Sequence, residues 1–122
     1  MAYSASSEVT QLVASLYVDT NVNSTAQTDI TGAAATLYGG EIDNRLNQDQ
    51  PVFVKFYNSG SVTNASNPLV LVYVPPASIG RFVFPEGIIF DTAVSALVTT
   101  TAATNNSPQN ANNQVTARLL VV

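Results

Sequence analysis

Residues 51–58, with the sequence Pro-Val-Phe-Val-Lys-Phe-Tyr-Asn, are the stretch that most restricts the fold of this chain. A proline is followed by an almost unbroken run of β-branched and aromatic residues, which favour strands. In a strand, successive side chains point to opposite faces. That alternation puts Val52, Val54 and Phe56 on one face, and Phe53, Lys55 and Tyr57 on the other. The pattern predicts a central strand with little water on either face.

Short runs of apolar and β-branched residues alternate with turn-forming residues along most of the chain. We count seven or eight strands, which predicts an all-β fold, an antiparallel β-sandwich of the jelly-roll or immunoglobulin-like kind. A length of 122 residues fits a single domain. We place this β-sandwich domain at residues 8–122, after a small, polar N-terminal arm at residues 1–7.

Residues 8–18 fit two structures. Their apolar positions match helical spacing, at Val9, Leu12, Val13 and Leu16. Residues 16–18, Leu-Tyr-Val, instead have the composition of a strand. We favour a strand over the second half of the segment because the neighbouring segments are all β.

Three further segments carry local predictions. The pair Gly39-Gly40 marks a β-bulge or a close approach of two backbones. Residues 69–74 are apolar throughout, which predicts a strand buried on both faces. Residues 85–87, Pro-Glu-Gly, predict a turn with a positive φ at the glycine. Alternation along the strands then predicts a core of nine residues: Val52, Val54, Phe56, Leu69, Leu71, Val83, Phe90, Val94 and Leu97.

The chain is unusually poor in charge. Charged residues are 10% of the sequence, against about a quarter in ordinary soluble domains, whereas 42 of the 122 residues are Asn, Thr, Ser or Gln. Such a surface suits a protein that assembles against other subunits, or simply a β protein with Thr-rich strands and Asn-rich turns. The net charge of −4 and four scattered basic residues argue against nucleic acid. No apolar run approaches transmembrane length, so we expect no membrane partner.

Catalytic chemistry has little support in the sequence. The chain has no histidine and no cysteine, so an imidazole base and thiolate chemistry are excluded. No G-x-S-x-G nucleophile motif is present either. Glu41 and Asp43, with loop carbonyls, would be the ligands of a calcium site, but solvated charges at a strand end are the better interpretation. We therefore predict no enzyme, no cofactor and no metal.

Lys55 and Arg81 each interrupt an apolar strand, and two interpretations remain open. In the first, each charge reaches water at the strand's edge or pairs with Asp43, Asp91 or Glu86. In the second, both charges face an interface between subunits.

The order of motifs from Val52 onwards resembles a small β-sandwich protein found among the structural proteins of tailed bacteriophages. Residues 54–58 (Val-Lys-Phe-Tyr-Asn) are followed by a polar loop and an apolar strand, then by the turn at residues 74–77 (Val-Pro-Pro-Ala). Residues 85–90 (Pro-Glu-Gly-Ile-Ile-Phe) and a strand of small residues and Thr complete the pattern. The resemblance covers about residues 33–100 and offers no catalytic residues.

The resemblance implies a virion location and a structural role, most simply as a capsid decoration (cement) protein that stabilises the shell by bridging capsomers. Its expected partners are copies of itself, with a trimer favoured, and the major capsid protein or other virion proteins. A tail, neck or knob component is the alternative within this class, and a carbohydrate-binding or adhesin-like sandwich is the alternative outside it. The predicted interface residues are Met1, Ala2, Tyr3, Ser4, Lys55, Arg81, Leu120, Val121 and Val122.

Overall fold

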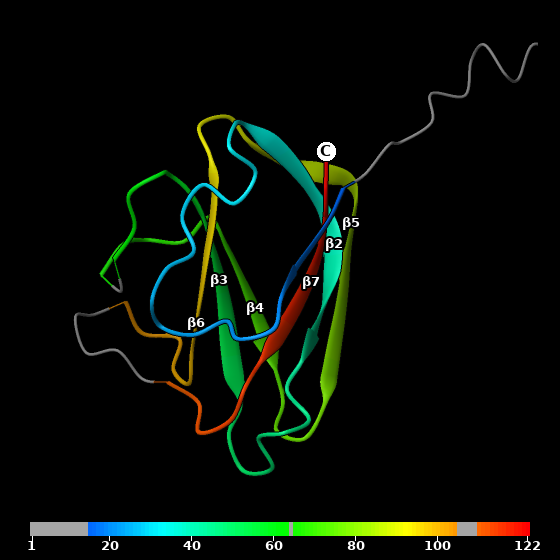
Figure 1. Cartoon of the computed structure of the whole chain (residues 1–122), viewed down its shortest axis with the longest axis vertical. Coiled ribbons are helices and arrows are strands. Elements are labelled where there is room, and N and C mark those ends of the chain that lie inside the picture. Colours follow the sequence, from blue (N-terminus) through cyan, green and yellow to red (C-terminus); the bar gives the residue numbers. More distant parts are fainter. Residues whose placement is uncertain (1–14, 64, 105–109) are drawn as a thin grey trace, which may run out of the picture.

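The computed structural model describes residues 15–63, 65–104 and 110–122. This part of the chain is all-β and contains no helix, and its strands pack as two layers (Figure 1). The seven strands are β1 (Ser15–Asp19), β2 (Ala35–Asp43), β3 (Val52–Asn58), β4 (Val70–Val74), β5 (Ile79–Phe90), β6 (Val94–Thr99) and β7 (Thr116–Val121). The predicted fold class and strand number are therefore confirmed.

The strands form two antiparallel sheets. The larger sheet has the order β1-β7-β2-β5, and the smaller sheet has the order β4-β3-β6. β3 is the central strand of the smaller sheet, as residues 51–58 predicted. Only β3 and β4 are consecutive in the chain and adjacent in one sheet. β1 and β2 share the larger sheet but are separated by β7, and each of the other four connections joins strands of different sheets.

A segment outside the named strands continues the smaller sheet beyond β6. Gln27 and Ala96 exchange two backbone hydrogen bonds of 2.8 and 2.9 Å, and the N–H of Ile30 donates to the carbonyl of Val94 at 2.8 Å. Residues 22–30 therefore occupy the place of an eighth strand and protect the edge of β6. With this segment included, two four-membered layers connected by crossovers give the jelly-roll arrangement, one of the two sandwich types predicted.

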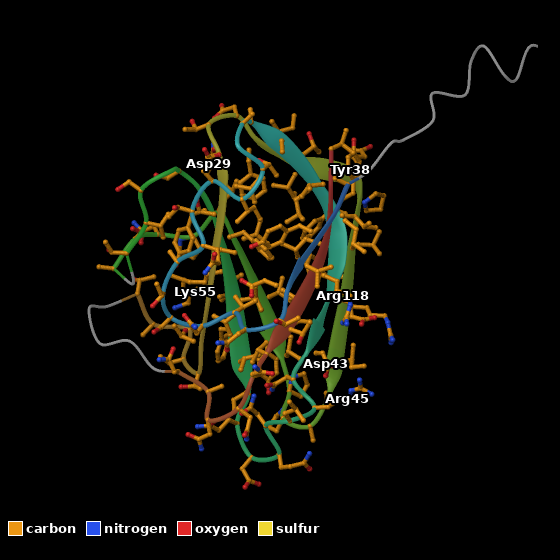
Figure 2. All side chains as sticks on the ribbon, viewed as in Figure 1. Asp29, Tyr38, Asp43, Arg45, Lys55 and Arg118 are labelled. Carbon is orange, nitrogen blue, oxygen red and sulfur yellow. The ribbon has the colours of Figure 1, made fainter. Side chains whose placement is uncertain are left out.

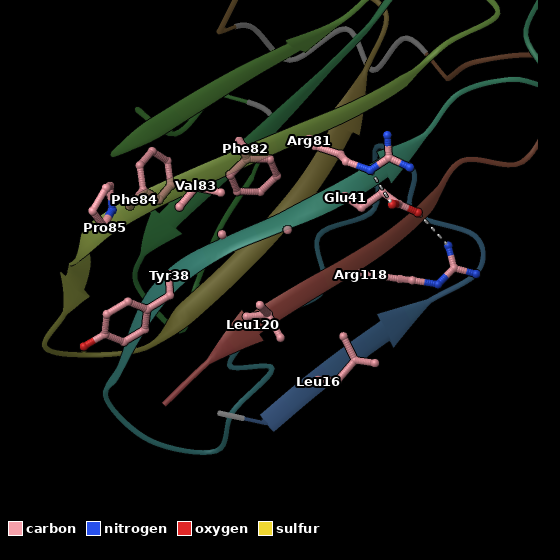
Figure 3. A pocket seen from close by; sticks show the side chains of 12 residues that line it. Leu16, Tyr38, Glu41, Arg81, Phe82, Val83, Phe84, Pro85, Arg118 and Leu120 are labelled. Atoms are coloured by element: carbon pink, nitrogen blue, oxygen red, sulfur yellow. Dashed lines mark hydrogen bonds and ion pairs between the residues drawn. The ribbon is translucent and has the colours of Figure 1, made fainter. Parts of the chain in front are cut away.

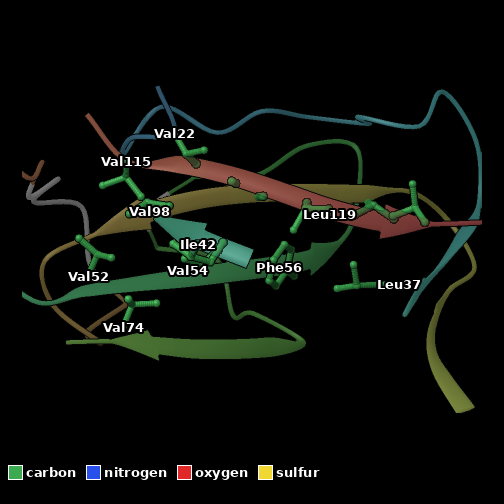
Figure 4. Packing of buried hydrophobic residues seen from close by; sticks show 14 of the residues in the cluster. Val22, Leu37, Ile42, Val52, Val54, Phe56, Val74, Val98, Val115 and Leu119 are labelled. Atoms are coloured by element: carbon green, nitrogen blue, oxygen red, sulfur yellow. The ribbon is translucent and has the colours of Figure 1, made fainter. Parts of the chain in front are cut away.

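The hydrophobic core lies between the two sheets (Figure 4). The β3 residues Val52, Val54 and Phe56 are fully buried there, and the ring of Phe56 lies 5.9 Å from that of Phe82 on β5. Six of the nine predicted core residues are buried: Val52, Val54, Phe56, Phe90, Val94 and Leu97. Leu97 is buried on the other face of the smaller sheet, opposite Lys55.

The core prediction is wrong for three residues. Leu69, Leu71 and Val83 are 53%, 45% and 74% exposed. Leu71 lies on β4, which is an edge strand with one face open to water, so the prediction that residues 69–74 are buried on both faces is wrong as well. On β5 the inward positions belong to Phe82 and Phe84, which pack against the core, and alternation then directs Val83 outward.

The predicted bulge at the glycine pair is confirmed. The register of β2 shifts between Leu37 and Gly39 against both neighbouring strands. Gly39 has a φ of 155°, and a Cβ on it would lie 2.5 Å from the carbonyl oxygen of Phe82. Glycine is therefore required here both by the backbone conformation and by the close approach of β5.

The Pro-Glu-Gly sequence at residues 85–87 does not separate two strands, contrary to the prediction. β5 continues through it, because Val83 pairs with Gly39 and Ile88 pairs with Leu37. Residues 84–87 thus form a long bulge opposite Tyr38. The positive φ expected at Gly87 is present, at 76°.

The predicted strand at the second half of residues 8–18 is confirmed as β1, which pairs with β7. The first half of that segment and the predicted arm at residues 1–7 lie outside the described residues. The domain boundary at residue 8 therefore stays a prediction.

Candidate functional site

The outward face of the larger sheet is an exposed apolar surface. The register aligns Leu16 of β1 with Leu120 of β7, Gly39 of β2 and Val83 of β5 in one row across all four strands. The three side chains of this row are all exposed. Because a sheet normally presents polar residues to water on its open face, this row is the feature of the fold that most requires an explanation.

The same surface continues towards one end of the sheet. Ile89 on β5 is 71% exposed, and Val122, just beyond β7, is half exposed. Thr36 lies between them, since it pairs with Ile89 and exchanges two backbone hydrogen bonds with Val122. We call the five exposed side chains Leu16, Val83, Ile89, Leu120 and Val122 the apolar face.

A groove of about 550 Å³ crosses this face (Figure 3). Gly39 and Gly40 line it without side chains, and this gap between larger neighbours creates the depression. Leu16 and Leu120 lie on one side, while Val83 and Pro85 of β5 lie on the other. The bulges that interrupt β2 and β5 therefore also shape the groove.

Three charged residues border the groove at one end. The register places Arg118, Glu41 and Arg81 side by side on β7, β2 and β5. Nε of Arg81 donates to Oε2 of Glu41 at 3.0 Å, and Nη1 of Arg118 lies 3.6 Å from Oε1 (Figure 3). The Glu41 carboxylate thus forms ion pairs with both guanidinium groups. This row of three residues carries a formal charge of +1 in a chain of net charge −4.

The outward face of the smaller sheet is different, because loops cover much of it. Lys55 is only 1% exposed, and its Nζ donates a 2.7 Å hydrogen bond to the carbonyl of Ala103. Figure 2 shows Lys55 on the loop-covered side of the molecule and Arg118 on the opposite side. The cross-strand neighbours of Lys55 are Leu71 and Leu97. Burial lowers the pKa of Lys55 below its ordinary value of 10.5.

The pairing predicted for the two strand-interrupting charges is wrong. Lys55 bonds to a backbone carbonyl and Arg81 bonds to Glu41, so neither pairs with Asp43, Asp91 or Glu86. Asp43 instead accepts hydrogen bonds from its neighbour Arg45, which lower the pKa of the Asp43 carboxyl.

The carboxylates do not assemble a metal site among the described residues. Glu41 and Asp43 are committed to different arginines, and the described ranges hold no group of three or more Asp or Glu that could bind an ion. The described part of the chain also has no helix that is long and apolar enough to cross a bilayer.

A buried amide cluster at one end of the sandwich has a structural task. The side chain of Asn44 donates to the carbonyls of Gln50 and Pro75 and accepts a hydrogen bond from Asn47. Asn47 in turn exchanges hydrogen bonds with the backbone of Asn113. The cluster ties three loops together, and because its amides bond to one another and to backbone, we assign it no ligand.

Three of the predicted interface residues lie together on the groove side of the larger sheet: Arg81, Leu120 and Val122. Val121 points into the core and Lys55 is covered by loops, so neither is accessible in the isolated chain. The other predicted residues, Met1, Ala2, Tyr3 and Ser4, lie outside the described residues. The sequence prediction missed Leu16, Val83 and Ile89, although strands with apolar residues at consecutive positions were a signal for a second apolar face.

Comparison with known proteins identifies no relative. No protein-family model, no curated protein and no solved structure matches the chain. The candidate site therefore has to be interpreted from its own chemistry.

Proposed function

We propose that the protein is a non-catalytic structural subunit of a phage virion, most simply a capsid decoration (cement) protein that bridges neighbouring capsomers. One observation carries this proposal, namely the exposed apolar face with its groove. An isolated chain gains nothing from exposing Leu16, Val83 and Ile89 to water, whereas an assembling subunit buries such residues against a partner.

Two further features support a role in assembly. The jelly roll is an architecture of viral capsid proteins, although it also occurs in lectins, so the fold alone does not decide the function. The order of motifs over residues 33–100, which resembles small virion proteins of tailed phages, is the second support. Together they favour a virion over other assemblies.

Co-purification with intact particles is the direct test. We expect the wild-type protein to remain with particles through a density gradient, and Val83→Asp to be lost from them, because the charge would be buried in the contact. Leu71→Asp, on the other sheet, is the matched control and should be retained. Wild-type protein absent from particles would contradict the proposal. The copy number per particle separates a decoration protein, present in many copies, from a tail or neck component, present in few.

We expect a homo-oligomer, with a trimer favoured. Light scattering of the purified protein at tens of micromolar, free and rebound to shells, measures the mass directly. A monomer in both states would contradict this expectation.

A carbohydrate-binding role is the second candidate, and one observation favours it. Tyr73 on β4 is 54% exposed, and its ring lies 5.2 Å from that of Phe53, which gives an aromatic pair at the surface of the smaller sheet. A sugar-binding protein would bind immobilised polysaccharide through this pair, and Tyr73→Ala would abolish the binding. Retention of Tyr73→Ala on particles, together with loss of Val83→Asp, favours the structural role.

A further inference from the structure

The groove restricts the chemistry of whatever fills it. Its centre is apolar, since Gly39 and Gly40 provide no side chains and Leu120 and Val83 flank them. Its charged end has two guanidinium groups for one carboxylate, and the side chains of Arg81 and Arg118 are 70% and 45% exposed. A complementary occupant is therefore a single extended or helical segment with aliphatic side chains and one carboxylate.

The chain itself contains a segment of this kind immediately before β1. Residues 8–14, Glu-Val-Thr-Gln-Leu-Val-Ala, combine three large aliphatic side chains with Glu8, which is the only charged side chain in residues 1–14. The segment joins the described structure at Ser15, next to Leu16 on the rim of the groove. Seven extended residues span about 23 Å, whereas four strands span about 14 Å, so the segment can reach beyond its own sheet.

We propose that the groove binds residues 8–14 of a second copy of this chain, with Val9, Leu12 and Val13 over the apolar row and the Glu8 carboxylate beside Arg81 and Arg118. This inference deepens the proposed function and rests on it, since it names how subunits recognise one another. Each subunit gives a segment to one neighbour and receives one from another, so the contact is head-to-tail, and in the expected trimer it closes into a ring.

A second copy fits better than the same chain. To enter its own groove, the segment would have to reverse direction directly before Ser15. Residues 8–14 contain no Gly, Pro, Asn, Asp or Ser, which are the residues that favour tight turns. Val13 is β-branched, which further disfavours a turn at that point. Continuation away from β1 towards a neighbour requires no such reversal.

Cysteine cross-linking tests the proposal in the full-length protein, because the natural chain has no cysteine. Leu12→Cys protein carrying an affinity tag is mixed with untagged Val83→Cys protein and treated with a short bis-maleimide reagent. We expect tagged–untagged dimers. The matched control is Leu71→Cys, an exposed leucine on the other sheet, and it should give none. Equal cross-linking to both positions, or none to Val83→Cys, would overturn the proposal.

The double variant Leu12→Cys/Val83→Cys distinguishes the two sources of the segment. Cross-linked dimers and higher species support exchange between copies, whereas cross-links confined to single chains contradict it.

The charge contact has its own measurement. Glu8→Gln should weaken self-association about two- to five-fold, the range of an exposed ion pair, and Glu86→Gln on the β5 bulge is the neutralised-carboxylate control. These experiments use purified protein without particles, so their outcome is independent of the co-purification result.

Discussion

At the scale of single residues, the buried ammonium group of Lys55 is an unfavourable feature of the described structure. Among the described residues, its Nζ has one hydrogen-bond acceptor, the carbonyl of Ala103, and no carboxylate partner. Removing an ammonium group from water is unfavourable unless it is paired. Covering the Lys55 ammonium group with the loop that carries Ala103 is therefore energetically unfavourable.

We predict that Lys55→Met raises the free energy of unfolding at pH 7 by an amount on the order of 1–3 kcal/mol. Methionine fills a similar volume without charge, and Ala103 is exposed, so water can replace the lost donor. Chemical denaturation of both proteins measures the difference. A less stable Lys55→Met protein would show that the ammonium group is better compensated than this geometry implies.

The pH dependence of that difference follows from the lowered pKa of Lys55. The unfolded chain binds this proton more tightly than the folded chain, so wild-type stability rises with pH between the folded-state pKa and the ordinary value of 10.5. We expect the advantage of Lys55→Met to be largest near neutral pH and to shrink as the pH approaches 10.5. An advantage that stays constant over that range would contradict the assignment.

Phe56 provides the matching test of the core. We predict that Phe56→Ala lowers the free energy of unfolding by about 3–5 kcal/mol, because its ring is fully buried between the sheets. Leu71→Ala, on the exposed side of β4, is the control and should change stability far less. Thermal melting of both variants checks the assignment of faces.

At the scale of elements, the β2 bulge is the decisive local feature. We predict that Gly39→Ala destabilises the protein by about 1–3 kcal/mol, since alanine is strained at this φ and its Cβ would meet the β5 backbone. Gly60→Ala is the control, because a Cβ there has no neighbour within 4 Å. Equal melting temperatures for the two variants would contradict this account.

The sequence predicted strands well and their surroundings less well. Residues 51–58 predicted β3 correctly because both of its faces are covered, one by the core and one by loops. The same reasoning was wrong for β4, whose apolar composition does not reveal that it is an edge strand. Sheet order depends on contacts between distant segments, which local alternation does not encode.

The candidate site was less predictable for the same reason. Arg81, Leu120 and Val122 were singled out individually, but only the register of β1, β7, β2 and β5 brings them to one face. Val83 was assigned to the core by alternation, but Phe82 and Val83 are both apolar, so alternation alone cannot tell which of them points inward. The groove was unpredictable, since it arises where two bulged strands meet.

At the scale of the whole molecule, the scarcity of charge predicts how the protein adheres. Apolar burial and hydrogen bonds are screened little by salt, whereas the Debye length falls from about 10 Å at 0.1 M to about 3 Å at 1 M. We predict that particles retain the protein in 1 M sodium chloride. Salt should remove only the modest contribution of the charged row to the binding free energy. Quantitative release by salt alone would contradict attachment through apolar burial and hydrogen bonds.

Deletion of residues 1–7 is the corresponding test of the N-terminal arm. We expect weaker retention on particles with an unchanged melting temperature, because a peptide arm can add backbone hydrogen bonds to the sheet edge of a neighbour. Full retention of the shortened protein would show that these seven residues take no part in the contact.

The pairing of β1 with β7 has a consequence for how the chain reaches its native state. Ser15 lies opposite Val121, so the larger sheet joins segments from nearly opposite ends of the sequence. Such non-local contacts require closure of a long loop before they stabilise anything, which places sandwiches of this kind among the slow folders, at about milliseconds to seconds. During synthesis, β2 and β5 can pair early, but β7 must insert between β1 and β2 after it leaves the ribosome. Until then the two strands that flank its position have open edges, and a nascent chain is most vulnerable to aggregation.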